Sequence, residues 1–233
     1  MRQVRKRVLL LCLVLVALSV YVWRQGWRVP DTWNPWAALD VREPPNLLTP
    51  YKLGRLQDNP QLCAQALATS DLRYRPQADS PPDAPCPLEN VVRVEGSSVR
   101  LSSSFLASCP LAVAYALFER HALQPAAQRA FSQPVVQVDH LGSFACRNMY
   151  NRKVGRLSQH ASANALDIAG FRLADGQRVQ LLKDWSGGGA KARFLRDVHA
   201  SACDSFNTVL GPDYNAAHRN HFHLDMGFWQ ICR

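Results

Sequence analysis

The sequence has no CxxC or CxxH pair, no internal repeat and no low-complexity tract. Its 15 prolines and 12 glycines in 233 residues are far from collagen-like or disordered levels, and 47% of the residues are hydrophobic. These absences argue against wholesale disorder, zinc-ribbon sites and thioredoxin chemistry. The triple glycine at 187–189 also lacks the Gly-Lys-Ser/Thr of a phosphate-binding loop. The length suits one or two compact domains with a sizeable core.

Acidic residues are scarce, with 18 Asp and Glu against 27 Lys and Arg and a formal net charge of +9. The first 28 residues contain no acid and carry +6 by themselves, which leaves only +3 for the rest of the chain. A residual charge of this size is an ordinary surface for about two hundred residues. We therefore expect no nucleic-acid partner, despite the high pI.

The amino terminus predicts export. Residues 1–7 are basic and residues 8–23 form an uncharged apolar run. This order predicts an inner-membrane anchor at 8–23 with a cytoplasmic segment at 1–7 and a periplasmic domain. The run is slightly short for a spanning helix, which needs about 17–25 residues, so a cleaved signal and secretion to the periplasm is the alternative. A buried helix of a cytosolic domain is the third interpretation.

The rest of the chain predicts a tether at 24–58, rich in Trp, Pro and Asn and partly packed, and a domain at 59–233. Helices are expected first and strands later, with one late helix, which indicates an α+β domain with a small, mostly antiparallel sheet flanked by helices. The expected helices are 60–68, 110–121, a short one from 125, and 191–206. The expected strands are 91–94 and 99–101, paired as a hairpin, and 135–138, 143–147, 165–171, 209–210 and 221–226.

Six cysteines remain once Cys12 in the apolar run is set aside: Cys63, Cys86, Cys109, Cys146, Cys203 and Cys232. An even set in an exported chain predicts three disulfides. Buried free thiols are the alternative. Spacing does not select the connectivity, and we weakly favour the pairs 63–86, 203–232 and 109–146.

Three histidines fall within six residues near the carboxyl end: His218, His221 and His223. On a strand, His221 and His223 share one face while Phe222 points into the core. Two imidazoles on one face are costly to bury without a partner. An isolated pair is nevertheless weak support for a site, because most such histidines are only hydrogen-bonded surface residues.

A second group lies upstream, with His160 followed by Asp167. On the predicted strand, Leu166 and Ile168 pack inward and Asp167 faces the other way. His160, Asp167 and His223 together offer two nitrogens and one oxygen. That set suits a catalytic Zn²⁺ with one open position for water.

Two motifs resemble known zinc peptidases. The segment 158–167 (SQHASANALD) resembles the S-x-H-x-x-G-x-A-x-D signature of the peptidases related to lysostaphin, D-Ala-D-Ala dipeptidases and the hedgehog signalling domain. The run HRNHFH at 218–223 is similar to the H-x-x-H-x-H of penicillin-insensitive murein endopeptidases. The resemblance implies a hedgehog/D-Ala-D-Ala-peptidase-like fold. Two positions depart from these patterns, since Ala163 replaces the signature glycine and Asn220 stands where the dipeptidases have a glutamate base.

A longer resemblance covers about four fifths of the chain. Residues 44–232 resemble the bacterial extensin-like C-terminal domain family, through the segments SFACR, SQHASANALDI, FLRDVHASAC and VLGPDYNAAHRNHFHLD. The expected activity rests on the peptidase-like motifs.

The resemblances imply a role for each site residue. Zinc would lie on His160, Asp167 and His223, with His221 as general base or transition-state stabiliser and His218 as a weaker candidate. Arg147 would hold a substrate carboxylate or the oxyanion, or else be a plain surface arginine. Asp225 and Ser158 would support the ligands from behind.

The expected function is a zinc-dependent peptidase that acts on peptidoglycan stem peptides or their cross-links. One alternative is a module of the same fold that binds the wall, or another envelope protein, without catalysis. A purely structural disulfide-stapled domain is the other.

Overall fold

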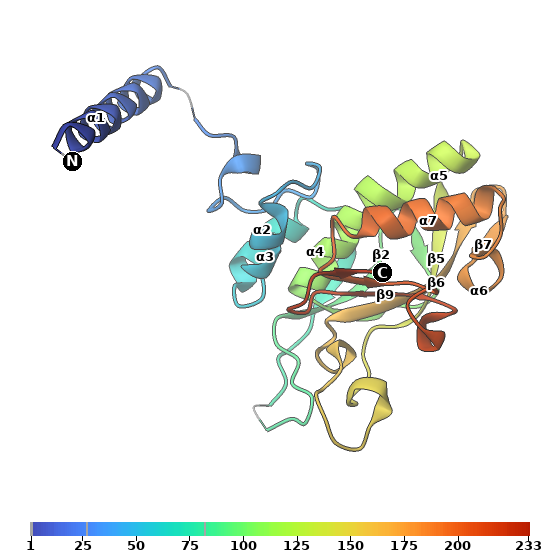
Figure 1. The fold of residues 1–233 in the computed structure, drawn as a ribbon. Coiled ribbons are helices and arrows are strands. Elements are labelled where there is room, and N and C mark those ends of the chain that lie inside the picture. The colour runs from blue at the N-terminus through green and yellow to red at the C-terminus, as the bar shows by residue number, and fades with distance from the viewer. Residues whose placement is uncertain (1, 27, 82) are drawn as a thin grey trace. The chain divides into compact units, whose positions relative to one another are not determined.

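The computed structural model describes residues 2–26, 28–81 and 83–233. Met1, in the predicted basic segment, and Trp27, in the predicted tether, lie outside the described residues. The chain divides into two compact units, Met1–Ala37 and Ala38–Arg233. Each unit is traced in Figure 1.

The first unit contains the helix α1 (Arg2–Arg24) and the short helix η1 (Asp31–Trp33). The aliphatic side chains that follow the basic segment of α1 are exposed, with Leu9 at 63%. Among the helices of the described residues, none is long and apolar enough to cross a bilayer. The uncharged run is confined to residues 8–23 and directly follows Arg5, Lys6 and Arg7. The predicted membrane anchor at 8–23 is therefore not supported.

The second unit is built on a mixed seven-stranded sheet with the order β10-β8-β9-β6-β5-β3, in which β7 also pairs with β6. The pairs β10–β8 and β3–β5 are parallel and the others are antiparallel. This agrees with the expected mixture of helices and a mostly antiparallel sheet. Its strands are β3 (Arg100–Leu101), β5 (Val135–Gly142), β6 (Ala165–Leu173), β7 (Arg178–Gln180), β8 (Thr208–Leu210), β9 (Phe222–Asp225) and β10 (Ile231–Cys232).

A smaller antiparallel sheet has the order β1-β2-β4. Its strands are β1 (Arg73–Pro76), β2 (Val91–Gly96) and β4 (Phe105–Ser108). The predicted hairpin of 91–94 with 99–101 is wrong, because β2 pairs with β1 and β4 while β3 pairs with β5 in the larger sheet. The predicted strand 143–147 is also wrong, since this segment is irregular after β5 ends at Gly142.

Helices cover one face of the larger sheet, with α5 and α7 side by side over it (Figure 1). Phe194 of α7 packs against Phe171 of β6 at 5.4 Å and against Phe131 of α5 at 5.3 Å between ring centroids. The helices of this unit are α2 (Thr49–Gly54), α3 (Pro60–Leu67), α4 (Cys109–Phe118), the π-helical turn η2 (Glu119–Leu123), α5 (Gln124–Phe131), α6 (Leu181–Asp184) and α7 (Ala190–Ala202), with the 3₁₀ turns η3 (Met149–Asn151), η4 (Gln159–Ser162) and η5 (Ala216–His218).

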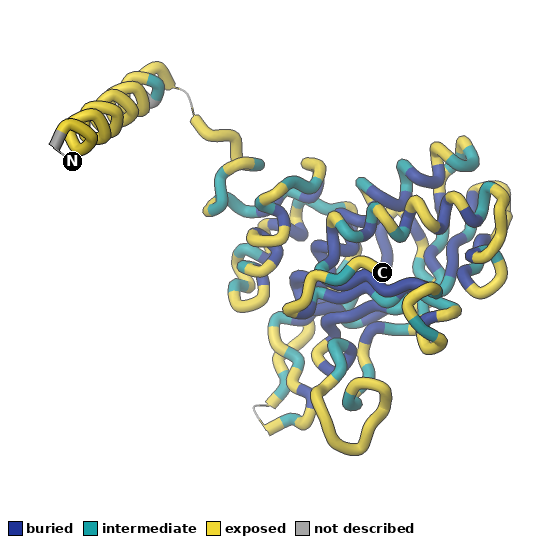
Figure 2. The backbone as a smooth tube through the Cα atoms, viewed as in Figure 1, coloured by how far each residue is buried: buried dark blue, intermediate teal, exposed yellow. Residues whose placement is uncertain are grey.

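The core lies between these helices and the sheet, as the buried segments in Figure 2 show. Every residue of α4 is buried, because its run of Leu, Ala, Val and Phe is apolar all round. Residues from the predicted tether also join the core, including Leu39, Val41 and Leu53. The second part of 24–58 therefore packs with the domain, whose compact unit begins at Ala38.

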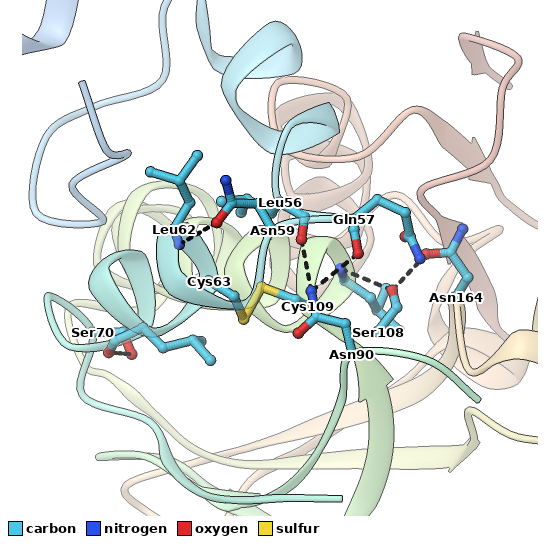
Figure 3. Close-up of a disulfide and its surroundings, with 12 residues drawn as sticks. Leu56, Gln57, Asn59, Leu62, Cys63, Ser70, Asn90, Ser108, Cys109 and Asn164 are labelled. Atoms are coloured by element: carbon cyan, nitrogen blue, oxygen red, sulfur yellow. Dashed lines mark hydrogen bonds between the residues drawn. A yellow bond between two sulfur atoms is a disulfide. The ribbon is translucent and has the colours of Figure 1, made fainter. Parts of the chain in front are cut away.

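Three disulfides form among the six cysteines, as expected: Cys63–Cys109, Cys86–Cys146 and Cys203–Cys232. The predicted pair 203–232 is confirmed. The predicted pairs 63–86 and 109–146 are wrong, because α3 packs against the start of α4 and brings Cys63 to Cys109 (Figure 3). Cys86, in the loop before β2, is thereby left for Cys146 in the irregular segment after β5.

The Cys63–Cys109 disulfide joins two capped helix starts. The Asn59 side chain accepts a hydrogen bond from Leu62 N at 3.0 Å, and Ser108 Oγ accepts one from Leu111 N at 3.3 Å (Figure 3). Both caps satisfy amides that a helix leaves unpaired at its first turn. Both sulfurs are buried, so the disulfide holds α3 onto the central helix from inside the core.

We predict that the double variant Cys63→Ala/Cys109→Ala loses about 2–4 kcal/mol of unfolding free energy, since the bond closes a loop with a sequence separation of 46. Urea denaturation followed by circular dichroism measures the loss. Cys12→Ser is the matched control and leaves stability unchanged, because Cys12 is a free, exposed thiol. An unchanged midpoint in the double variant would contradict this role of the bond.

Candidate metal centre

The register of β6 against β9 places the downstream histidines beside the upstream carboxylate. Asp167 is paired directly with His223, and Ala165 with Asp225. Because side chains alternate along a strand, the flanking residues Leu166 and Phe222 point into the core and are fully buried. Asp167 and His223 therefore face the side opposite to the helices.

His160 reaches the same place from the turn η4. Ser158 begins this turn, and its Oγ accepts a hydrogen bond from His160 N at 3.3 Å. His160 Nδ1 donates to the carbonyl oxygen of Ser143 at 3.1 Å, just beyond the end of β5. This bond keeps the proton on Nδ1 and turns Nε2 toward Asp167.

Three donor atoms meet on this face. His160 Nε2 lies 3.3 Å from His223 Nδ1 and 3.2 Å from Asp167 Oδ2, and His223 Nδ1 lies 3.0 Å from Asp167 Oδ1. Ligands that bind one Zn²⁺ at about 2.0–2.2 Å are themselves separated by little more than 3 Å. Among the described residues, these three form a group that could hold a metal ion. Their spacing and their two nitrogens and one oxygen fit such an ion.

Asp225 supports His223 from behind. Its Oδ2 accepts a hydrogen bond from His223 Nε2 at 2.9 Å, and its Oδ1 accepts one from Gly227 N at 2.7 Å. The carboxylate is buried and thus has a fixed place. A carboxylate on the far nitrogen of an imidazole is the arrangement that orients metal-binding histidines and raises their basicity.

His221 and His218 complete the cluster. His221 Nε2 lies 3.5 Å from Asp167 Oδ1, and the ring of His218 lies 5.3 Å from that of His221 and 5.7 Å from that of His223 between centroids. The structure thus brings His160, His221 and His223 to the carboxylate of Asp167, each with a ring nitrogen within 3.5 Å of it. The fifth residue, His218, adjoins this group.

Two asparagines that the sequence did not identify orient these two rings. Asn220 Oδ1 accepts from His221 Nδ1 at 2.9 Å, and Asn215 Oδ1 accepts from His218 Nδ1 at 2.8 Å. An amide oxygen can only accept, so both protons sit on Nδ1 and both Nε2 atoms carry lone pairs. Asn220 was noted only as a departure from a dipeptidase motif. Its place directly before His221 was the available signal.

Burial and nearby charges shift the pKa values of the histidines in the cluster in opposite directions. Burial lowers the pKa of His218 to about 4, helped by the nearby imidazoles, and burial also lowers the pKa of His221. For His223 burial acts downward too, but hydrogen bonds to Asp167 and Asp225 outweigh it and raise the pKa to about 9. For Asp167 burial acts upward, yet the bonds from His160 and His223 hold its pKa well below the usual range.

The cluster lies in a cavity of about 330 Å³. Arg147 and Arg156 line this cavity, as do the aromatic residues Tyr214, Phe228 and Trp229. Arg147 is half-buried, and its backbone oxygen accepts a hydrogen bond from Ser158 N at 3.1 Å. Arg147 thus lines the same cavity as the cluster, and its role stays a prediction.

Ala163, at the position of the signature glycine, has a backbone conformation that favours glycine. Its φ of +52° is left-handed, which costs an alanine about 1–2 kcal/mol relative to glycine. The replacement therefore leaves the turn between His160 and Asp167 in place at an energetic cost. The next residue, Asn164, accepts from Ser108 Oγ at 2.6 Å and donates to Gln159 Oε1 at 2.8 Å. Through Asn164 the turn is bonded to the start of α4 (Figure 3).

A family model described as Extensin-like protein C-terminus matches residues 61–233. This span contains all three disulfides and every residue of the cluster. No curated protein and no solved structure matches the chain. The predicted hedgehog/D-Ala-D-Ala-peptidase-like fold therefore has no structural neighbour to support it.

We predict that the metal-free protein is most stable near pH 6.5. The lowered pKa of His218, about 4, means that the unfolded chain takes up a proton first, so stability is lost as the pH falls from 6.5 toward 4. The raised pKa of His223, about 9, means that the folded protein holds a proton which is lost between pH 6.5 and 9, so stability falls there too. Thermal unfolding across this pH range, in the presence of a chelator, measures the loss of stability on both sides.

Two variants test which histidine causes the loss of stability on each side of pH 6.5. His218→Asn makes the loss of stability toward low pH shallower, with the remainder due to His221, whose pKa is also lowered. Asp225→Asn moves the loss of stability at high pH to lower pH, because His223 loses one of its two carboxylate partners. Identical pH profiles for the variants and the parent chain would contradict the assignment.

Proposed function

Because this chain belongs to the extensin-like C-terminal family and gathers two imidazoles and a carboxylate in an open cavity, we propose that it is a zinc-dependent peptidase of the cell envelope. Its substrates are the stem peptides or cross-links of peptidoglycan. One observation carries the proposal: donor atoms of His160, Asp167 and His223 lie 3.0–3.3 Å from one another.

The donor set favours Zn²⁺ over other common ions. Three protein ligands of mixed nitrogen and oxygen type are typical of catalytic zinc, which keeps a further position open. The anchors on the ligands, Ser143 for His160 and Asp225 for His223, hold both rings in place before an ion arrives. When bound, zinc lowers the pKa of water and polarises a carbonyl group.

The chain's own residues supply the proton chemistry. His221 carries its proton on Nδ1, where Asn220 accepts it, so its Nε2 is free to take a proton from an attacking water. Its lowered pKa keeps it neutral at pH 7. The same nitrogen then gives the proton to the leaving amine as the peptide bond breaks. His218 lies behind His221 and serves less directly.

Arg147 gives the cavity its preference for anionic peptides. A guanidinium group in the cavity wall binds a carboxylate through two parallel hydrogen bonds. Wall peptides carry free carboxylates, which makes them suitable partners for this group. The same side chain can also stabilise an oxyanion that develops on the scissile carbonyl.

The disulfides agree with this compartment. Three disulfides among six cysteines form in an oxidising environment such as the periplasm or the cell exterior. Peptidoglycan is found in the same place. The proposal therefore needs export of the domain, by whichever route, and needs no nucleic-acid partner.

We predict one tightly bound Zn²⁺ per full-length, oxidised chain. His160→Ala, Asp167→Ala and His223→Ala lose the ion, because each removes a ligand. Asp225→Asn weakens zinc affinity about 10–100-fold, since it removes the partner that orients His223. Metal analysis after dialysis measures both effects. His140→Ala, whose imidazole bonds to Ser103 O instead of to the cluster, is the control and retains the ion.

We predict that the zinc-loaded chain releases new muropeptides from purified sacculi, detected by chromatography and mass spectrometry. His221→Ala keeps the ion but lowers kcat by about 10²–10⁴-fold, the range for a lost general acid–base. Unchanged sacculi in the presence of stoichiometric zinc would contradict the peptidase proposal. Sacculus binding that survives in His221→Ala, with no product from any form, would instead identify a wall-binding module.

A further inference from the structure

Two aromatic side chains stand exposed at the cavity that holds the cluster. Phe228 is 85% exposed and Trp229 is 58% exposed, and both line the cavity together with the cluster residues. Their rings meet edge to face, with centroids 5.2 Å apart. We call this pair the aromatic platform. Large apolar side chains with such exposure beside a cavity mark a binding surface.

The backbone beneath the platform is held by hydrogen bonds on both sides. Asp225 Oδ1 accepts from Gly227 N at 2.7 Å, and Asn207 Nδ2 donates to Gly227 O at 2.7 Å. Thr208 Oγ1 donates to Trp229 O at 2.9 Å. The backbone that carries the exposed rings is therefore ordered before a ligand binds, which lowers the entropic cost of binding.

Gly227, directly before the platform, packs against the turn η4 that carries His160. A Cβ at this position would lie 2.8 Å from Gln159 Nε2 and 2.9 Å from Asp225 Oδ1. Only glycine allows so close an approach to both. Gln159 directly precedes His160, and Asp225 contacts His223. The platform is thus fixed relative to both histidine ligands.

We propose that the aromatic platform binds a pyranose ring of the glycan strand to which the substrate peptide is attached. This inference rests on the proposed function and deepens it, because it names which form of the wall the site accepts. The domain would act on peptides that remain joined to their sugars in preference to free peptides.

The shape of the platform favours a sugar as occupant. An apolar side chain needs an enclosing pocket, whereas rings this exposed offer an open face suited to stacking with a flat partner. A pyranose ring has such a face of C–H groups. The peptides of the wall carry small and charged side chains, so the sugar is the part of the substrate that can cover two rings.

Basic residues that line the same cavity suit the other part of the substrate. The segment 147–156 carries four basic residues and no acid, and its two ends, Arg147 and Arg156, line the cavity. Guanidinium groups there favour peptide carboxylates. A substrate in this cavity thus places its carboxylates on Arg147 and Arg156 and its sugar on the platform.

The direct test is binding of the β-1,4-linked tetramer of N-acetylglucosamine to the full oxidised chain, measured by calorimetry and by tryptophan fluorescence. Trp229→Ala and Phe228→Ala each weaken binding at least tenfold. Tyr51→Ala, which removes a 52% exposed aromatic side chain of the same unit that is not among the residues lining the cavity, leaves binding unchanged. Tetramer affinity that is equal in the parent chain and in Trp229→Ala, or no binding at all, overturns the inference.

A chelator and a matched pair of substrates separate this inference from the proposed function. The chelated chain still binds the tetramer, because the platform contains no metal ligand. The zinc-loaded chain cleaves intact sacculi at least tenfold faster than the same peptides freed from glycan, and Trp229→Ala removes this preference. If Trp229→Ala lowers the cleavage rate equally on both substrates, the platform binds a peptide side chain. That result overturns the inference but leaves the proposed peptidase activity intact. Tetramer binding without any hydrolysis overturns only the proposed function.

Discussion

The pairing of β6 with β9 is the constraint on which the cluster depends. Antiparallel strands align one residue of each directly opposite the other, and here the aligned residues are Asp167 and His223. A slip by one residue would turn both side chains into the core and bring Leu166 or Phe222 to the surface. The buried residues of the two strands therefore determine the place of the polar ones.

The cluster concentrates ionisable groups at a cost that an ion would relieve. Asp167 lies within hydrogen-bonding or ion-pair distance of three imidazoles, and His223 lies between two carboxylates. In the metal-free protein a proton on His223 balances those carboxylates, which is why its pKa is raised to about 9. A divalent cation at this site would replace that proton, so the proposed zinc binding would release a proton.

Strand alternation was enough to predict which residues face together. It correctly placed Phe222, Leu166 and Ile168 inside, because each is an apolar residue beside a polar one on a half-buried strand. The approach of His160 depends on a tertiary hydrogen bond to Ser143, which spacing alone could not predict. The sequence grouped His160 with Asp167 and His223 by their ligand chemistry, and the motif resemblance supported that grouping.

Long-range pairings were beyond what local pattern could predict. Val91–Val94 and Val99–Leu101 have the composition of a hairpin, yet they belong to different sheets, because each finds a better partner elsewhere in the chain. Cys63 and Cys86 are consecutive cysteines in the sequence, but they form disulfides with different partners, Cys109 and Cys146. The roles of Asn215 and Asn220 depend on side-chain geometry that appears only once the turn before β9 is formed.

X-ray absorption spectroscopy of the full, oxidised chain loaded with one equivalent of Zn²⁺ tests the central claim most directly. The account predicts a first shell of nitrogen and oxygen atoms at about 2.0–2.2 Å, with the outer-shell scattering of two imidazole rings that is absent in His223→Ala, because that variant does not hold the ion. A shell containing sulfur at about 2.3 Å, or a spectrum that His223→Ala leaves unchanged, would contradict it.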